Sequence, residues 1–185
     1  MSAAVVLLSG GIDSAACVAY MQSVAAVLEA VFVDYLQPAR ESERESATRI
    51  AQHYKIPLQV VQATATPPEA GEIAGRNAFL VLSALMLRPH FKGLVTLGIH
   101  AGTPYYDCSE VFTTDMQRIL DGYSNGKIQL SAPFLSWTKG QILDFCRAKA
   151  VPMQLTWSCE TTSHIPCGQC LSCKDRALMN ASAAH

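Results

Sequence analysis

The chain has 185 residues, of which 50% are apolar and 16% charged, and its formal net charge at pH 7 is −1. A chain of this size can bury one sizeable core, and its balanced charge gives no overall field for a polyanion, so we expect no direct nucleic-acid partner. No apolar run approaches the roughly 20 residues that span a membrane, and no basic region precedes the apolar run at the N-terminus. We therefore expect a cytoplasmic protein without membrane contact.

In chain order, short runs rich in Val, Ile and Leu alternate with longer segments of helical periodicity. Runs of this kind are typical of parallel strands that are buried on both faces. The predicted strands are Ala4–Leu8, Ala30–Val33, Leu58–Val61, Leu94–Ile99 and Ile128–Leu130.

Between the strands, apolar residues recur at helical spacing over residues 47–54 and 112–123, which predicts helices with one apolar face. The segment Asn77–Leu87 is apolar all round, so we expect it to be a central, buried helix. Thr138 is predicted to be the N-cap of a further helix. The alternation predicts an α/β fold, a doubly wound, Rossmann-like, parallel five-stranded sheet, whose ligands bind at the carboxyl ends of the strands.

The sequence Ser-Gly-Gly-Ile-Asp-Ser at Ser9–Ser14 follows the first predicted strand and leads into the first helix. Its two glycines allow a tight turn with bare backbone, and exposed amides beside a helix N-terminus form a site for anions. We expect Ser9, Asp13 or Ser14 to cap the helix. The loop is neither a Walker loop nor a G-x-G-x-x-G loop, and from residue types alone an ordinary strand-to-helix turn is the alternative.

Four of the seven cysteines lie near the C-terminus, at Cys159, Cys167, Cys170 and Cys173. The two C-x-x-C steps share Cys170, and turns of this pitch place thiolates about 2.3 Å from one tetrahedral Zn²⁺. Because four cysteines leave no coordination position open, we expect a structural zinc site. Ordinary buried cysteines and an iron–sulfur cluster are the alternatives. His164 lies in the same segment and is expected to be a surface residue, not a further ligand.

The order S-G-G-x-D-S resembles the signature of the PP-loop ATP pyrophosphatases, the adenine nucleotide α-hydrolase-like family. In that family the loop holds the pyrophosphate of ATP while a substrate oxygen attacks the α-phosphate, which yields an adenylated substrate and pyrophosphate. Backbone amides and hydroxyls can hold pyrophosphate, and an aspartate can help to position Mg²⁺. The resemblance implies a PP-loop ATP-binding α/β domain at residues 1–155, with a zinc-binding C-terminal segment at residues 156–185 packed on it.

Further motifs, in the same order along nearly the whole chain, resemble those of the 7-cyano-7-deazaguanine synthases. They are Asp34-Tyr35-x-Gln37, Gly75-Arg76-Asn77, Gly98, Tyr106-Asp107-Cys108, the stretch from Pro133 through Trp137 to Lys139, and the cysteine tail. The resemblance implies that the nucleotide is bound by Ser9, Gly10, Gly11, Asp13, Ser14, Asp34 and Gly98. It implies that a deazaguanine is bound by Tyr35, Gln37, Arg76, Asn77, Tyr106 and Asp107.

The same resemblance assigns catalysis to Ser9, Asp13, Arg76 and Lys139. From the residues alone, Lys139 could be a solvated lysine of a first helical turn, Arg76 a member of a local ion pair, and Asp107 a turn or cap residue. Cys108 is expected to be a small buried residue, not a nucleophile.

The implied reaction adenylates the carboxylate of 7-carboxy-7-deazaguanine with ATP and Mg²⁺. Ammonia then attacks to give an amide, and a second ATP activates the amide oxygen so that elimination gives the nitrile of queuosine biosynthesis. Each activation releases AMP and pyrophosphate. A homodimer, or a protein partner that supplies the acceptor amine, would fit this resemblance.

The chain departs from the family pattern around the substrate. Leu36 replaces the Gly of the family's Gly-Gln-Arg-His, residues 64–74 are shorter than the family's insert, residues 99–104 lack its acidic pattern, and Ser109 replaces an Arg. These changes suit a paralogue, such as the synthase-like proteins of bacterial antiviral operons, which would join the activated deazaguanine to a protein amine. A non-catalytic, nucleotide- or zinc-dependent binding module is the third hypothesis.

Overall fold

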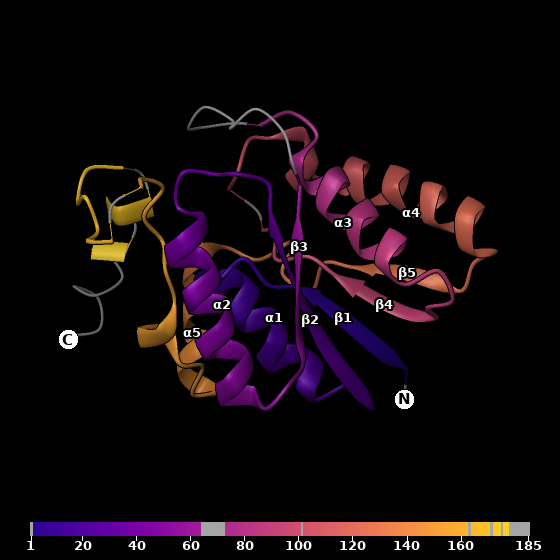
Figure 1. Ribbon diagram of the computed structural model, residues 1–185, viewed down its shortest axis with the longest axis horizontal. Coiled ribbons are helices and arrows are strands. Elements are labelled where there is room, and N and C mark those ends of the chain that lie inside the picture. The colour runs from indigo at the N-terminus through magenta and orange to yellow at the C-terminus, as the bar shows by residue number, and fades with distance from the viewer. Residues whose placement is uncertain are drawn as a thin grey trace.

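A parallel sheet forms the centre of the protein (Figure 1). The computed structural model describes residues 2–63, 73–100, 102–162, 164–170, 172–174 and 176–177. The sheet has five strands in the order β3-β2-β1-β4-β5, and every neighbouring pair is parallel. The strands are β1 (Ala3–Leu7), β2 (Val27–Asp34), β3 (Leu58–Gln62), β4 (Gly93–Thr96) and β5 (Ile128–Ser131). All five predicted strands are confirmed, and so is the doubly wound parallel fold.

Helices cover both faces of the sheet, as the alternation of elements predicted. The helices are α1 (Ile12–Gln22), α2 (Arg40–Tyr54), α3 (Arg76–Leu87), α4 (Glu110–Ser124) and α5 (Lys139–Ala148), with the short 3-10 helices η1 (Tyr106–Cys108) and η2 (Met153–Leu155). In Figure 1, α1, α2 and α5 lie on one side of the sheet and α3 and α4 on the other.

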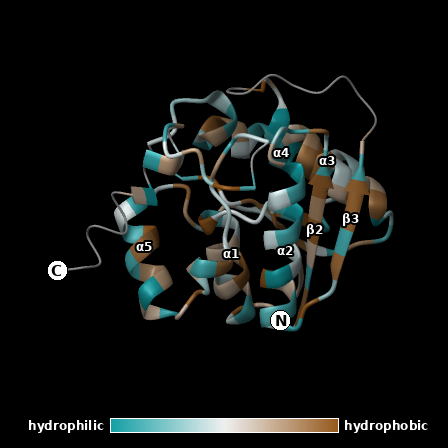
Figure 2. Cartoon of the chain, turned by 60° about the vertical axis from the view of Figure 1, so that its left-hand side comes forward, coloured by the Kyte–Doolittle hydropathy of each residue, from teal (hydrophilic) through white to brown (hydrophobic). Residues whose placement is uncertain are grey.

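Each face of the sheet has its own hydrophobic core, because successive strand residues point to opposite faces. In β1, Ala4 and Val6 pack with α1, α2 and α5, whereas Val5 and Leu7 pack with α3 and α4. A strand with two buried faces must be apolar at nearly every position, and β2 is coloured hydrophobic along most of its length in Figure 2. The neighbouring α2 shows hydrophilic bands in the same view, as a helix with one solvent face should.

Helix α3 differs from its prediction as a central, buried helix. Val81 and Ala84 are buried against the sheet, but Phe79 is 42% exposed and Met86 is 81% exposed. The prediction is wrong because α3 lies in an outer layer, where only the side that faces the sheet can be buried. Apolar residues around the whole helix therefore do not establish burial around the whole helix.

The two helices that meet the loop of Ser9–Ser14 begin differently. Helix α5 begins with a complete capping box, in which the Thr138 hydroxyl accepts from Gln141 N and the Gln141 side chain accepts from Thr138 N, so the predicted N-cap is confirmed. Helix α1 has Gly11 as its N-cap residue and no side-chain cap, so the predicted caps are wrong. The Ser14 hydroxyl instead donates back to the Gly11 carbonyl, 2.9 Å away. The amides at the start of α1 are therefore left for another partner.

The strand order places the loop at a topological switch point. β1 pairs with β2 on one side and with β4 on the other, and the connection from β1 leads to α1 on one face whereas that from β4 leads to α4 on the opposite face. Clefts in such sheets open at the carboxyl ends of the strands at this point.

Among the described residues, none of the helices has the length and apolarity that a membrane crossing requires.

Candidate active site

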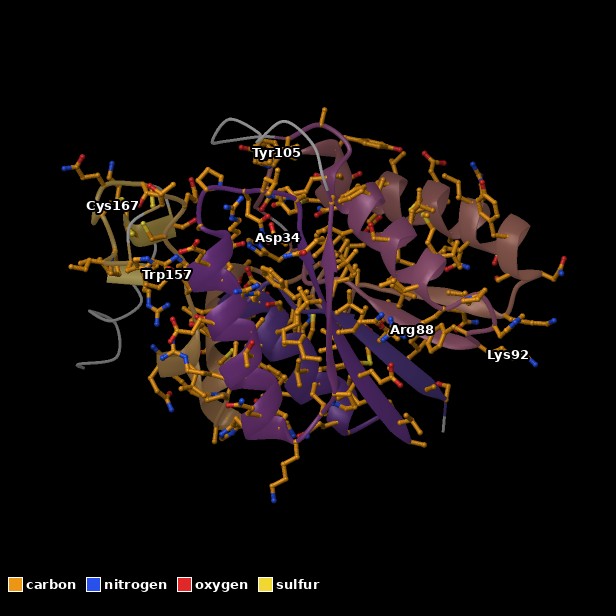
Figure 3. The ribbon with its side chains drawn as sticks, in the orientation of Figure 1. Asp34, Arg88, Lys92, Tyr105, Trp157 and Cys167 are labelled. Carbon is orange, nitrogen blue, oxygen red and sulfur yellow. The ribbon has the colours of Figure 1, made fainter. Side chains whose placement is uncertain are left out.

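A cavity of about 500 Å³ opens at the carboxyl ends of β1, β2 and β4. Its walls come from the loop after β1, the segment after β2, the first turns of α2 and α3, and the segment after β4. Two residues of the C-terminal tail, Glu160 and Ser172, also line it. In Figure 3, Asp34 and Tyr105 lie at this end of the molecule, whereas Arg88 and Lys92 lie toward its other side. The cavity is where the switch point predicts a ligand.

One group of polar residues in the cavity, the loop cluster, consists of Ser9, Asp13, Ser14, His100 and Lys139. Lys139 Nζ donates to both carboxylate oxygens of Asp13, at 2.6 Å each. His100 Nε2 lies 3.8 Å from Asp13 Oδ2. The hydroxyl of Ser9 donates to that of Ser14 at 3.2 Å. The cluster therefore combines a cation, hydroxyls and the uncapped start of α1, which together suit a bound polyphosphate.

Two glycines give this cluster its close backbone packing. Gly10 has a φ of +87°, and a Cβ there would lie 2.5 Å from the Glu43 carbonyl oxygen. A Cβ on Gly98 would lie 3.0 Å from the Asp13 carbonyl carbon. β4 ends at Thr96, before the predicted end at Ile99, and Gly98 lies just beyond it against the loop. A side chain at Gly10 would clash with the backbone of α2, and one at Gly98 would press tightly on the loop.

A second group, the wall cluster, consists of Tyr35, Gln37, Glu43, Arg76 and Asn77. Gln37 Nε2 donates to Glu43 Oε2 at 2.8 Å, and Gln37 Oε1 accepts from Tyr35 N at 2.9 Å. Burial raises the pKa of Glu43, and the Gln37 hydrogen bond and the Arg76 charge oppose that rise. Burial also raises the pKa of Tyr35, and the charge of the neighbouring Arg76 opposes that rise. The wall cluster is thus a connected set of donors and acceptors in a water-poor site.

Asp34 does not line the cavity, although it lies beside it. Its side chain is buried, and Oδ1 accepts from Leu36 N at 3.0 Å. Leu36 has a φ of 65°, a conformation that ordinarily favours glycine. The Asp34 carboxylate therefore stabilises the turn that presents Tyr35 and Gln37 to the cavity.

Tyr106 and Asp107 also lie outside the cavity lining. Asp107 Oδ2 accepts from Asn77 N at 3.1 Å, and the Asp107 carbonyl accepts from Asn77 Nδ2 at 2.9 Å, so this buried residue holds the start of α3. Tyr106 is 58% exposed, and its hydroxyl donates to Asp115 Oδ2. The structure brings Arg76 and Asn77 into the cavity but does not bring these two residues with them. Cys108 is buried and lines the cavity, and burial raises the pKa of its thiol to about 11. A thiol with a raised pKa agrees with the expectation of a small buried residue.

Glu43, His100, Glu160 and Ser172 line the cavity although the sequence did not single them out as site residues. Glu43 lies among several charged residues of α2, and only the packing of α2 against the Ser9–Ser14 loop distinguishes it. Glu160 and Ser172 reach the cavity through the fold of the tail, where Ser172 Oγ donates to Glu160 Oε1 at 2.6 Å. His100 lies two residues after Gly98, which packs against the loop. The glycine is a signal in the sequence that could have indicated that the residues after it reach the cavity.

The four tail cysteines form a candidate metal centre. Their sulfur atoms all lie within 4.8 Å of one another, and Cys167 Sγ and Cys173 Sγ are 4.0 Å apart. A tetrahedral Zn²⁺ with Zn–S bonds of about 2.3 Å would separate its sulfurs by about 3.8 Å, so the arrangement fits a metal ion with little adjustment. His164 lies outside the cluster, largely exposed, with Nε2 3.7 Å from Glu41 Oε2, as expected for a surface residue.

The thiols of this cluster differ in acidity. Burial raises the pKa of Cys159, but hydrogen bonds from Thr161 and from Cys167 N outweigh that effect and lower it to about 6. Burial raises the pKa of Cys173 to about 12. A thiolate at Cys159 and backbone amides aimed at Cys159 and Cys167 sulfurs are what a sulfur-ligated metal requires.

Backbone contacts join this centre to the cavity. Trp157 N donates to the Gly10 carbonyl at 2.9 Å, and Trp157 Nε1 donates to the Cys159 carbonyl at 2.8 Å. Arg176 donates to the Met153 and Thr156 carbonyls, each at 2.9 Å. Trp157 and Cys167 both lie on the tail side of the molecule in Figure 3. The metal centre is therefore positioned to stabilise the loop from outside.

Comparison with known proteins assigns the chain to a family. The model of the family described as queuosine biosynthesis protein QueC matches residues 3–71 and 66–182. A 7-cyano-7-deazaguanine synthase from Prochlorococcus marinus strain MIT 9312 is 29% identical over 205 residues, covering 93% of this chain and 90% of that protein. The enzyme of the same name from Synechococcus elongatus is 30% identical and covers 98% and 92%, respectively.

Solved structures with the same fold include a tRNA thiolase and an NAD synthetase. The U34-tRNA thiolase NcsA from Methanococcus maripaludis, solved with its 4Fe-4S cluster, has a TM-score of 0.54 at 13% identity and covers 99% of this chain and 66% of that one. The NH3-dependent NAD synthetase from Campylobacter jejuni has a TM-score of 0.51 at 15% identity and covers 83% and 66%. At these identities the likeness shows a shared fold alone.

The match to the family model divides between the third strand and the third helix. The two matched stretches meet at residues 66–71, inside the segment that is shorter than the family's insert. The alignments extend over 205 positions although the chain has 185 residues, so the relatives contain additional residues. Residues 64–72 lie outside the described part of the chain. With its family model matched over nearly the whole length, the chain belongs to the QueC family of queuosine biosynthesis proteins.

Proposed function

We propose that this chain is an ATP-dependent ligase that activates the carboxylate of a 7-deazaguanine acid by adenylation and transfers the acyl group to an amine. AMP and pyrophosphate would be the other products. Family membership supports the substrate class. The observation that carries the reaction type is the loop cluster, where Lys139 meets Asp13 beside the uncapped start of α1.

Adenylation solves a chemical problem, since a carboxylate is a poor electrophile whose leaving group would be oxide. Joining it to the α-phosphate replaces that leaving group with AMP. The pyrophosphate that departs would lie on the backbone amides at the start of α1 and on the hydroxyls of Ser9 and Ser14, while Gly10 and Gly11 shape the turn without lining the cavity. Lys139 would neutralise its charge as a mobile point charge, once the nucleotide competes for the contact that Lys139 now makes with Asp13.

The loop cluster also fits Mg²⁺. This ion is commonly held by one or two protein carboxylates together with substrate phosphates and water, and Asp13 supplies one carboxylate at the cavity. Released from Lys139, Asp13 would hold the ion, which supplies charge neutralisation to the phosphates when bound. Arg76, which the wall cluster holds beside Tyr35, would orient the acid or its adenylate.

The four cysteines would hold a structural Zn²⁺, since four sulfurs complete a tetrahedral shell and leave no position for a substrate. Four cysteines can also hold an iron–sulfur cluster. Elemental analysis with a visible absorption spectrum distinguishes the two. Zinc without absorption near the bands of an iron–sulfur cluster supports the proposal, and iron with sulfide contradicts it.

The products of ATP test the reaction type. Purified protein incubated with ATP, Mg²⁺, 7-carboxy-7-deazaguanine and ammonium should form AMP and pyrophosphate in equal amounts, and only when the acid is present. ADP and phosphate from an active preparation would contradict adenylation. Lys139→Met should form less AMP and pyrophosphate than the native chain. Lys149→Met, whose lysine lies outside the cavity lining, is the matched control and should not.

A second candidate concerns the acceptor. The division of the family match at residues 66–71 and the presence of Gly102, Thr103 and Pro104 on the cavity wall favour a site that differs from the synthases at the substrate. We propose that the reaction stops at an amide more readily than in the synthases, and that a larger amine can serve as acceptor. Mass spectrometry of the ammonium reaction tests this, because accumulated amide supports it, and efficient conversion to the nitrile by the isolated chain contradicts it.

A further inference from the structure

The proposed substrate has a guanine-like edge that a residue of the protein must recognise. This inference rests on the proposed function. That edge presents a ring N–H and an exocyclic amino group side by side, so it requires a paired acceptor such as a carboxylate. Asp107, which the family resemblance implied for base binding, does not line the cavity and already accepts from Asn77 N. The acceptor must therefore come from another residue.

Three carboxylates line the described part of the cavity wall, those of Asp13, Glu43 and Glu160. Both oxygens of Asp13 accept from Lys139 at 2.6 Å. Glu160 belongs to an exposed part of the tail, and its Oε1 accepts from Ser172. Glu43 lies deeper, in the first turn of α2, where its backbone packs against Gly10.

The surroundings of Glu43 orient its carboxylate. Gln37 Nε2 donates to Oε2 at 2.8 Å, while Gln37 Oε1 accepts from Tyr35 N. Gln37 is thereby held at both ends of its amide, so it acts as a positioning residue for Glu43 and has little capacity left for a substrate. Burial raises the pKa of Glu43, which indicates that its carboxylate has lost water that a ligand's donors could replace.

We propose that Glu43 is the residue that recognises the base, accepting hydrogen bonds from the ring N–H and the exocyclic amino group of the deazaguanine. Gln37 holds one oxygen so that the carboxylate faces the cavity. Arg76, which bears on both Glu43 and Tyr35, lies where it can bind the carbonyl oxygen on the same edge or the acid on the other ring. The contact explains selectivity, since a base without adjacent donors would leave the carboxylate with only its hydrogen bond from Gln37.

The consequence of Glu43→Gln follows from the Gln37 contact. Gln37 Nε2 is a donor, so the new amide would turn its oxygen toward Gln37 and its NH2 group toward the base. Two donors would then face each other at the edge that the carboxylate had accepted. Glu45→Gln is the matched control. It removes the same charge from α2 two residues further on, where the Glu45 side chain is 66% exposed.

Calorimetric titration tests the assignment with two probes, 7-carboxy-7-deazaguanine and the same acid without its 2-amino group. The native chain and Glu45→Gln should both bind the complete acid about 10- to 100-fold more tightly than the analogue, as the loss of a hydrogen bond to a charged group predicts. Glu43→Gln should bind the complete acid about 10- to 100-fold more weakly than the native chain. It should also bind the two probes with nearly equal affinity.

Three outcomes would overturn the assignment. If Glu43→Gln keeps the native preference between the probes, another residue recognises the base, and the proposed function stands. If Glu43→Gln loses ATP affinity to the same extent as acid affinity, Glu43 belongs to the nucleotide site. If the native chain neither binds the acid nor forms AMP with it, the proposed function fails and the assignment fails with it.

Discussion

The loop cluster and the wall cluster lie in one cavity but are assembled in different ways. The loop cluster draws most of its residues from the contiguous stretch Ser9–Ser14, and only Lys139 and His100 come from elsewhere. The wall cluster combines the segment after β2 with the first turns of α2 and α3, and its acceptor, Glu43, lies outside every motif. A site built from consecutive residues can be predicted from a sequence, whereas a site built from several elements depends on how those elements pack.

The largest expected effect separates the loop cluster from the fold. Asp13→Ala should lower turnover by about 1,000-fold, in the range seen when a preorganised electrostatic group is removed. Its partner is Lys139 and not the core, so the melting temperature should change little. Steady-state assay of AMP release and thermal denaturation measure the two effects. A variant that keeps its activity would show that the cluster does not perform the reaction.

Loss of the metal should affect the loop cluster through the tail. Cys170→Ser should reduce the zinc content from one ion per chain to nearly none and lower the melting temperature, because binding of the metal is coupled to folding of the tail. Cys146→Ala, at a cysteine outside the cluster, should keep the metal. Elemental analysis checks both variants, and unchanged metal content in Cys170→Ser would argue against the proposed ligands.

Asp107 distinguishes support of the wall from contact with the substrate. Asp107→Ala should destabilise the fold by about 2 kcal/mol, since Asn77 N would lose its buried acceptor. Because Asp107 does not line the cavity, the variant should keep its preference between deazaguanine probes with and without the 2-amino group. Urea denaturation and calorimetric titration measure these quantities. A lost preference in a folded variant would restore Asp107 as a substrate residue.

The smallest expected effect is at the turn that presents the wall cluster. Leu36→Gly should stabilise the chain by up to about 1 kcal/mol, because Leu36 adopts a φ of 65° that costs a residue with a Cβ about that much. Ala39→Gly, in the same loop at a φ of −87°, should not stabilise it. Urea denaturation compares the two variants, and equal effects would show that the left-handed conformation is not the cause.

Local signals account for the parts of the fold that the sequence predicts. Runs of Val, Ile and Leu indicate the five strands, since both faces of β1 and β2 are buried, and Thr138 with Gln141 indicates the start of α5. The burial of α3 was mispredicted because Met86 and Phe79 are apolar although their side chains are exposed to solvent. The cap of α1 was mispredicted because Asp13 is held by Lys139, far away in sequence, instead of by its own helix.

The same contrast applies to the site. The four cysteines could be predicted because their spacing alone brings the sulfurs together. The position of Asp107 and the role of Gln37 could not, because both depend on partners from other elements, Asn77 in one case and Glu43 in the other. Side-chain contacts between different elements, whether six residues apart as for Gln37 and Glu43 or thirty as for Asn77 and Asp107, leave no periodicity or spacing in the sequence.

The central claim is that the loop cluster adenylates a deazaguanine acid, and exchange of labelled pyrophosphate into ATP tests it most directly. Exchange requires reversible formation of the acyl-adenylate and does not depend on the acceptor amine. The native chain should catalyse exchange only when 7-carboxy-7-deazaguanine and Mg²⁺ are both present, and Asp13→Ala should not catalyse it. Exchange that ignores the acid, or no exchange from folded, metal-loaded protein, would contradict the account.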